Sequence, residues 1–340
     1  MRRVLLVSAT AKRGGAERSF AALARRLPDA GFQPHVVLLD QGPLEEWLSG
    51  TQVTHATAKE LTGLCGSADV VVANKWRAQL VAGPAAARAG RPCVWWQQDD
   101  PAASPAALLD GSVPAAVAVC ASERVLADQR RAAPWLPAVR IPLGIAADTV
   151  AAHRGSGATL RAALGAPLVG VVARLSPDKR QDHFLRAAAL VAGERADVRF
   201  AVVGGDILGT HAGYAAGLRA LAGELGIADR VVFAGDRPDV YAWIDALDVL
   251  AHPAEREPFG LVVLEALALG TRVIAVDGSG TAEILAGDTR GELVPAFDIE
   301  ALAAAVLRAL DRPAPADCGT AFTDKRMASA FAGVLADVAP

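Results

Sequence analysis

The feature that most constrains this fold is an alternation of short apolar runs with amphipathic segments, which starts again halfway along the chain. In the first half, a helical pattern at 16–31 lies among strand-like runs at residues 2–9, 34–40, 68–75, 91–98 and 116–123. The second half has helical patterns at about 182–192 and 214–225 among runs at 168–175, 198–206, 229–236, 248–254, 271–277 and 291–295. This alternation predicts parallel sheets covered by helices on both faces.

The length of the chain predicts two domains, because 340 residues exceed what a single hydrophobic core normally supports. Residues 140–160 have the composition of a linker. We therefore predict a first Rossmann-like domain over 1–145 and a second over 146–320. A final apolar helix in 321–340 is expected to pack back on the first domain. Two doubly wound sheets in tandem predict a ligand-binding cleft at the carboxyl ends of their strands.

Charge and cysteine content bear on the compartment and partners. Residues 1–145 carry 16 Lys and Arg against 12 Asp and Glu, and the remainder carries 18 against 25. A basic first half would attract an anionic acceptor or membrane surface, although a solvated surface explains this small excess more simply. Cys65, Cys93, Cys120 and Cys318 lack the spacing of a zinc site or disulfide framework. We predict a cytoplasmic protein without a nucleic-acid partner, and hypothesise peripheral contact with the inner membrane face.

The segment EPFGLVVLE, from Glu257 to Glu265, is the most informative stretch for function. It has two carboxylates around a Pro-Phe-Gly turn that leads into an apolar helix, and helix N-termini offer unpaired backbone N–H groups. Both carboxylates can therefore face a ligand held there, and a hydroxyl-rich, anionic ligand suits such a site. Two glutamates eight residues apart on a helix are, taken alone, usually a solvated face.

Two further segments suit anionic groups. Arg174 ends a predicted strand, and Lys179 follows it across a Ser-Pro-Asp turn that starts the next helix. Two cations beside a helix N-terminus favour a diphosphate and stabilise its charge as it leaves. In the first half, Gly14 and Gly15 permit close backbone approach at another helix start, although a lone diglycine is by default a turn.

The first half also has a candidate acceptor site in VWWQQDDP, where Trp95, Trp96, Gln98 and Asp99 lie at a strand end. Aromatic faces pack on sugar rings, while amides and carboxylates bond hydroxyls. Alternation along the strand means that at least one of the two tryptophans belongs to the core. The lone His252, on an apolar strand, is interpreted as a packing residue rather than a functional one.

These motifs together resemble those of the retaining nucleotide-sugar glycosyltransferases of family 4, which share the E-x7-E spacing with its EPFG, an R-L-x-x-x-K pattern and a G-G-A-E loop. The resemblance implies that Glu257 contacts donor-sugar hydroxyls and Glu265 the ribose, and that Arg174 and Lys179 bind the diphosphate. It places the donor-binding residues at Gly14, Gly15, Arg174, Lys179, Arg237, Glu257, Phe259, Gly260, Leu261 and Glu265, with Arg237 beside the nucleobase. The chain departs from the family at Arg180, where glycine is usual, and at Gln98-Asp99, where His-Asp is common.

The resemblance implies a GT-B fold and an enzyme that moves a hexose-type sugar from a UDP- or GDP-sugar to an acceptor hydroxyl with retention of configuration. It further implies a metal-independent reaction without a cofactor, with Glu257, Arg174 and Lys179 as the catalytic residues. Two alternatives stay open at this point. One is a nucleotide-sugar epimerase or phosphorylase of the same fold, and the other is a non-enzymatic nucleotide-sugar-binding subunit. The sequence does not name the sugar, the base or the acceptor.

Overall fold

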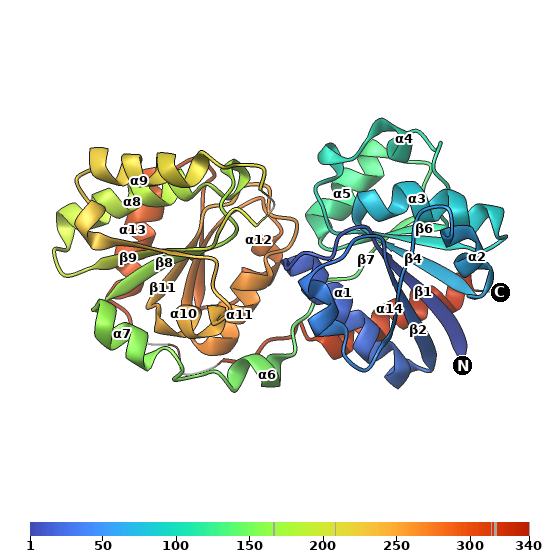
Figure 1. Cartoon of the computed structure of the whole chain (residues 1–340). Helices are drawn as coiled ribbons and strands as arrows, with labels where there is room; N and C mark the ends of the chain where they lie inside the picture. Colours follow the sequence, from blue (N-terminus) through green and yellow to red (C-terminus); the bar gives the residue numbers. More distant parts are fainter. Residues whose placement is uncertain (166, 208, 314, 316–317, 340) are drawn as a thin grey trace. The chain divides into compact units, whose positions relative to one another are not determined.

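The computed structural model describes residues 1–165, 167–207, 209–313, 315 and 318–339, and the chain forms two compact units. The first unit comprises Met1–Ala146 together with Phe322–Pro340, and the second comprises Ala147–Ala321. The chain thus leaves the first unit after Ala146 and returns to it at Phe322. Each unit has its own parallel sheet (Figure 1).

The sheet of the first unit has seven strands in the order β3-β2-β1-β4-β5-β6-β7, and every described pair is parallel. The strands are β1 Arg2–Ser8, β2 Phe32–Leu38, β3 Gln52–His55, β4 Val70–Asn74, β5 Cys93–Gln97, β6 Val117–Cys120 and β7 Ala138–Arg140. Sequence patterning missed β3 and β7. Both are short edge strands whose residues stay largely accessible to solvent, so neither has the apolar run of a buried strand.

Helices cover both faces of this first sheet. Its helices are α1 Gly15–Arg26, α2 Leu61–Gly66, α3 Lys75–Arg88, α4 Ala106–Leu109, α5 Glu123–Ala132 and α14 Asp324–Val338. Figure 1 shows α3, α4 and α5 on one face and α1 and α14 on the other. Short 3-10 helices in this unit lie at Leu27–Ala30, Pro43–Leu48 and Pro101–Ala103.

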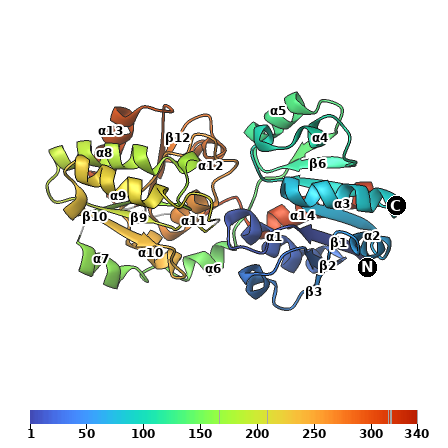
Figure 2. The same ribbon diagram turned by 45° about the horizontal axis from the view of Figure 1, so that its top comes forward.

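The returning segment completes the first unit, and α14 lies beside α1 (Figure 2). The backbones of Ile145 and Asp324 are joined by a hydrogen bond of 2.9 Å, and Asp324 accepts from Arg26 Nε at 2.8 Å. Phe331 of α14 is fully buried, with its ring centroid 4.9 Å from that of Trp96. The last helix therefore supplies part of the first unit's hydrophobic core.

The second unit has a six-stranded parallel sheet in the order β10-β9-β8-β11-β12-β13. The strands are β8 Leu168–Val172, β9 Arg199–Val203, β10 Val231–Gly235, β11 Val249–His252, β12 Arg272–Val276 and β13 Gly291–Val294. The helices are α6 Ala147–Ala151, α7 Ala158–Leu164, α8 Gln181–Glu194, α9 Tyr214–Glu224, α10 Val240–Ala246, α11 Leu261–Leu269, α12 Thr281–Leu285 and α13 Ile299–Leu310, with 3-10 turns at Pro177–Lys179 and Ala228–Arg230. The stretch 140–160, interpreted as a linker, contains α6 and the start of α7.

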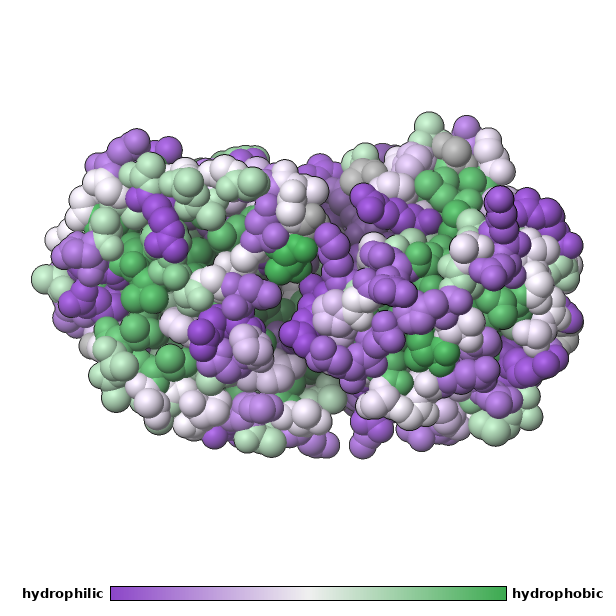
Figure 3. All heavy atoms as spheres, in the orientation of Figure 1, coloured by the Kyte–Doolittle hydropathy of each residue, from purple (hydrophilic) through white to green (hydrophobic). Residues whose placement is uncertain are grey.

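The basic side chains of α1 make contacts within the first unit. Arg26 is paired with Asp324, Arg25 donates to the backbone of Trp47, and Arg18 lies over the Trp47 ring. Hydrophilic residues predominate on the face of the first unit that Figure 3 shows. Among the residues that the structure describes, no helix is both long and apolar enough to cross a membrane.

The docking of the returning segment depends on a glycine. A Cβ on Gly144 would lie 2.2 Å from the backbone of Thr323, so Gly144→Ala forces the two backbones apart. We expect this substitution to cost about 1–3 kcal/mol and to lower the midpoint of thermal unfolding in a calorimeter. Gly63→Ala is the matched control, because a Cβ there meets nothing within 4 Å. Equal midpoints of thermal unfolding for Gly144→Ala and Gly63→Ala would contradict this role of Gly144.

Candidate functional site

The candidate site of the second unit lies where the strand order reverses. The first strand of this sheet, β8, has β9 on one side and β11 on the other, so the crossovers run in opposite directions from it. The carboxyl ends of parallel strands meet at one edge of the sheet, and ligands of doubly wound folds bind at such a reversal. Arg174 and Lys179 follow β8, and His252 ends β11 just before the Glu257 loop.

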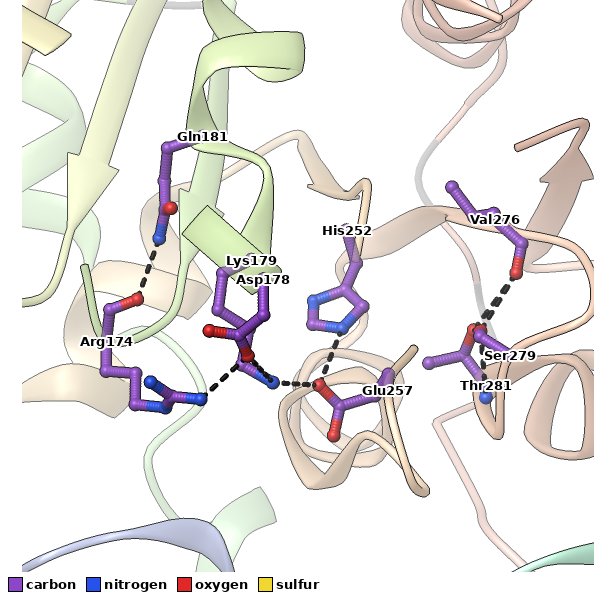
Figure 4. Close-up of polar contacts among 9 residues, drawn as sticks. All are labelled: Arg174, Asp178, Lys179, Gln181, His252, Glu257, Val276, Ser279 and Thr281. Atoms are coloured by element: carbon purple, nitrogen blue, oxygen red, sulfur yellow. Dashed lines mark hydrogen bonds and ion pairs between the residues drawn. The ribbon is translucent and has the colours of Figure 1, made fainter. Parts of the chain in front are cut away.

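At the centre of the site is an ion pair between Lys179 Nζ and Glu257 Oε2, 2.7 Å apart (Figure 4). The two side chains are only 14% and 15% exposed. Burial alone would raise the pKa of Glu257, but the charge of Lys179 and the contact with His252 outweigh it and hold this pKa well below its usual range. Glu257 is therefore a carboxylate at neutral pH.

A second carboxylate joins the two predicted cations. Arg174 Nη2 donates to Asp178 Oδ2 at 2.7 Å, and the same oxygen lies 3.6 Å from Lys179 Nζ. The buried side chain of Gln181 donates to the backbone oxygen of Arg174 at 2.8 Å, which holds the segment that follows β8. Charges thus alternate along the site, from Arg174 through Asp178 and Lys179 to Glu257 (Figure 4).

His252 belongs to this cluster, although sequence patterning interpreted it as a packing residue. It is 2% exposed, and its Nε2 lies 3.3 Å from Glu257 Oε2, the oxygen that Lys179 also contacts. Both ring nitrogens are buried, and neither makes a well-aligned hydrogen bond in the described part of the chain, so Nε2 and Glu257 are in close contact without one. The position of His252 at the last residue of a central strand was the available signal, because such residues face the ligand edge.

Close backbone packing fixes the loop that carries Glu257. Gly260 has φ +99°, and a Cβ there would lie 2.5 Å from the methyl carbon of Thr281. The backbone N–H of Gly280 donates to the backbone oxygen of Glu257 at 2.8 Å. Ser279 Oγ in turn donates to the Val276 backbone at 2.9 Å, which anchors this neighbouring loop (Figure 4). The carboxylate is therefore held by its backbone as well as by Lys179.

Residues 158–322, which include all of these groups, match the family model of glycosyl transferases, group 1. The family match thus lies in the second unit and covers almost all of it. The glycosyltransferase unit includes the Lys179–Glu257 pair and the reversal point between β8 and β11.

Similar proteins agree with this assignment. The chain is 40% identical over 168 residues to a D-inositol 3-phosphate glycosyltransferase of Mycobacterium avium, covering 48% of this chain and 38% of that protein. It is 35% identical over 156 residues to the lipopolysaccharide core biosynthesis mannosyltransferase LpcC of Rhizobium leguminosarum, covering 45% and 44% of the two chains. These alignments span less than half of either relative.

A solved structure shares the architecture over nearly the whole chain. HepE of Anabaena, crystallised with UDP and glucose, superposes with a TM-score of 0.82 at 24% identity, covering 98% of this chain and 95% of that one. This likeness, with two parallel Rossmann-like sheets, establishes the GT-B fold predicted from the sequence.

The remaining residues predicted for the glycosyltransferase unit are placed as follows. Glu265 lies in the second turn of α11, which begins at Leu261, and is 3% exposed. Phe259 and Leu261 are buried at 1% and 8% exposure, so a ligand could meet little more than their backbones. Arg237 Nε donates to Asp239 at 2.8 Å.

In the first unit, the predicted aromatic acceptor wall is wrong. Trp95 and Trp96 are 1% and 0% exposed, because β5 is a central strand buried on both faces. Trp95 packs in a core cluster with α5, and Trp96 packs against α14. Gln98 is also buried and bonds Asn74, while Asp99 is partly exposed. Gly14 and Gly15 lie at the start of α1, as the sequence indicates.

The four cysteines are free, and Cys65, Cys93 and Cys120 are buried. Burial raises the pKa of the Cys65 thiol to about 11 and that of Cys120 to about 12, so these are unreactive core side chains. No cluster of three or more His, Cys, Asp or Glu residues suited to a metal ion occurs in the part of the chain that the structure describes.

The ion pair predicts a pH-dependent loss of stability in Lys179→Met. Because the folded-state pKa of Glu257 is lowered, its ionisation stabilises the fold above the ordinary glutamate pKa, and this contribution is lost as the pH falls through the folded-state value. Removing Lys179 leaves a buried carboxylate, which should cost about 3 kcal/mol near neutral pH. The pKa of Glu257 then rises, so protonation of the variant's glutamate should narrow the difference from wild type as the pH falls from neutral to about 4, where the wild type also begins to lose its own contribution.

Urea unfolding near neutral pH and at about pH 4 measures this difference. Arg186→Met, which removes an exposed cation from α8 of the same unit, is the control. A loss of stability in Lys179→Met that is the same at both pH values would show that the packing of the lysine stem, rather than its charge, matters here.

Arg180 has a backbone conformation that glycine adopts more readily than arginine does. Its φ is +52°, in the left-handed region, while its Nη2 lies 3.2 Å from Glu255 Oε2 and its guanidinium lies over the Phe297 ring. Arg180→Gly and Arg180→Ala both lose these contacts, but only alanine keeps the strain. We expect the glycine variant to be the more stable of the two by about 1 kcal/mol in urea unfolding.

The same two substitutions at Arg186, inside α8, should show the opposite order, because glycine is unfavourable in a helix interior by about 1 kcal/mol. If alanine were the better residue at both positions, the left-handed strain at Arg180 would be refuted.

Proposed function

We propose that this chain is a retaining glycosyltransferase that moves a hexose-type sugar from a nucleoside-diphosphate sugar to an acceptor hydroxyl. The observation that carries the proposal is the largely buried Lys179–Glu257 pair, at the strand reversal of a unit that matches group 1 glycosyl transferases. In it a carboxylate suited to sugar hydroxyls lies beside two cations suited to a diphosphate.

The proposed donor roles follow from the charges. A diphosphate replaces Asp178 as the partner of Arg174 and Lys179, which lie 2.7 and 3.6 Å from that carboxylate. The two cations then stabilise the charge that develops on the leaving diphosphate. Lys179 and His252 both contact Oε2 of Glu257, so among the described residues Oε1 is the oxygen left to accept from a donor-sugar hydroxyl.

The remaining assignments are part of the same proposal. Glu265 bonds the ribose, the backbones of Phe259, Gly260 and Leu261 line the donor site, and Arg237 lies beside the base. UDP is the first nucleotide to test, because HepE was crystallised with UDP and with UDP-glucose. The reaction needs no metal or other cofactor, and the first unit holds the acceptor. The protein acts in the cytoplasm, with peripheral membrane contact as a hypothesis.

Substitution of the two glutamates tests the donor roles separately. Glu257→Gln should slow transfer by ~10²-fold while it changes the affinity for bare UDP little, because its partner is the sugar. Glu265→Gln should weaken both UDP binding and transfer, because its partner is the ribose. Titration calorimetry with UDP and a UDP-release assay with UDP-glucose measure the two effects, with exposed Glu224→Gln of α9 as control.

The reaction class has its own test. Product analysis should show a retained anomeric configuration, and a chelator should leave the rate unchanged. An inverted product, a strict requirement for a divalent cation, or the absence of turnover with both UDP- and GDP-sugars would overturn the proposal.

A further inference from the structure

A second polar cluster lies at the strand reversal of the first unit. There β1 has β2 on one side and β4 on the other, and the last residue of β4 and the segments after β1, β4 and β5 bring five polar side chains together. We call this group the first-unit cluster; its members are Thr10, Glu17, Asn74, Lys75 and Gln98. Its place corresponds to that of the donor cluster in the second sheet, because both follow the pair of strands where the order reverses.

Glu17 places a buried carboxylate at the start of α1. The residue is 4% exposed, and its Oε1 accepts from Thr10 Oγ1 at 2.9 Å and from Lys75 Nζ at 2.5 Å. Its Oε2 reaches back toward the first residue of the turn, since a Cβ on Gly14 would lie 2.5 Å from it. The diglycine suggested that the N-terminus of α1 binds a phosphate. The carboxylate of Glu17 already supplies a negative charge at that N-terminus.

Lys75 is held in an unusual conformation beside this carboxylate. It is the first residue of α3, its φ is +67°, and its side chain is 20% exposed. The ammonium group of Lys75 contacts the buried carboxylate of Glu17, while part of the lysine side chain stays exposed. The surface that Lys75 offers is therefore polar, and its charge is balanced by Glu17.

Gln98 supplies the observation that points to a ligand. The residue is 5% exposed, and its Nε2 donates to Asn74 Oδ1 at 2.7 Å and lies 3.5 Å from the backbone oxygen of Ala16 in the first turn of α1. Its Oε1 is buried and has no hydrogen-bond partner in the described part of the chain. A buried amide oxygen without a donor is unfavourable, and a ligand hydroxyl would satisfy it.

We infer that the first-unit cluster binds a neutral polyhydroxylated ring, a sugar or cyclitol, as the acceptor of the transfer. This inference rests on the proposed function and gives its acceptor a chemical class. The charge of Lys75 is already balanced by Glu17, so an added phosphate would meet a buried carboxylate at close range. Hydroxyls can accept from Lys75 while donating to Glu17 and to the Oε1 of Gln98.

Saturation-transfer NMR on the full chain tests the inference without requiring turnover. The probes are myo-inositol, methyl α-glucoside and methyl α-mannoside, compared with myo-inositol 1-phosphate and mannose 6-phosphate. We expect at least one neutral probe to bind, and Glu17→Gln and Lys75→Met each to weaken it roughly tenfold or more. Exposed Lys59→Met is the control and should bind as wild type does.

Gln98→Met serves as a second variant if the charge substitutions fail to fold, as judged by thermal unfolding. It removes the orphaned oxygen and leaves the Glu17–Lys75 pair intact, so loss of neutral-probe binding in this folded variant supports the inference. Wild-type protein that binds only phosphorylated probes, or no probe, would overturn it, as would unchanged binding in all folded variants. A separate UDP titration distinguishes failure of the donor site, because the polyol signals do not depend on it.

Discussion

Burial of both faces of each parallel sheet is the constraint on which the rest of this structure depends. Strands β4, β5 and β8 are buried along their whole described length, so most of their side chains contribute packing. Polar chemistry is therefore concentrated at the last residues of the strands and in the segments that follow them. Each unit places a polar cluster at its own strand reversal, and both clusters pair a glutamate of low exposure with a lysine.

The two ion pairs differ in what surrounds them. In the second unit, Arg174 and Asp178 extend the Lys179–Glu257 pair into a chain of alternating charges, and an incoming anion can exchange with a carboxylate there. In the first unit, the neighbours of the Glu17–Lys75 pair are hydroxyl and amide groups, and no second cation is paired with Glu17 among the described contacts. The first arrangement suits a charged donor, and the second suits a neutral ligand.

Much of the fold followed from the sequence, because long apolar runs and their alternation with helices report burial directly. The runs around Val4, Val171 and Val273 became central strands as predicted. Short edge strands such as Ala138–Arg140 carry no such signal, since an exposed strand has no required composition.

The polar cluster of the second unit, formed by Arg174, Asp178, Lys179, His252 and Glu257, was predictable in part. The spacing of Arg174, Lys179 and Glu257 pointed to one end of the sheet, and the structure brings Lys179 and Glu257 into contact. The contribution of His252 was missed, since a single histidine on an apolar strand looks the same whether it packs or bonds a carboxylate. Trp95 and Trp96 were misassigned because aromatic side chains suit both sugar-binding sites and hydrophobic cores. Only their burial in the folded protein decides between the two.

The division of the first unit into two chain segments has a consequence for biosynthesis. Domains generally fold as they emerge from the ribosome, N-terminal first. Here Trp96 is synthesised long before Phe331, the ring that covers it, and all of Ala147–Ala321 lies between them in the chain. The second unit can complete its core while the first still exposes apolar surface where α14 will dock. In this protein the domain that is made first is the last to be finished, and the nascent chain must protect its unfinished side in the meantime.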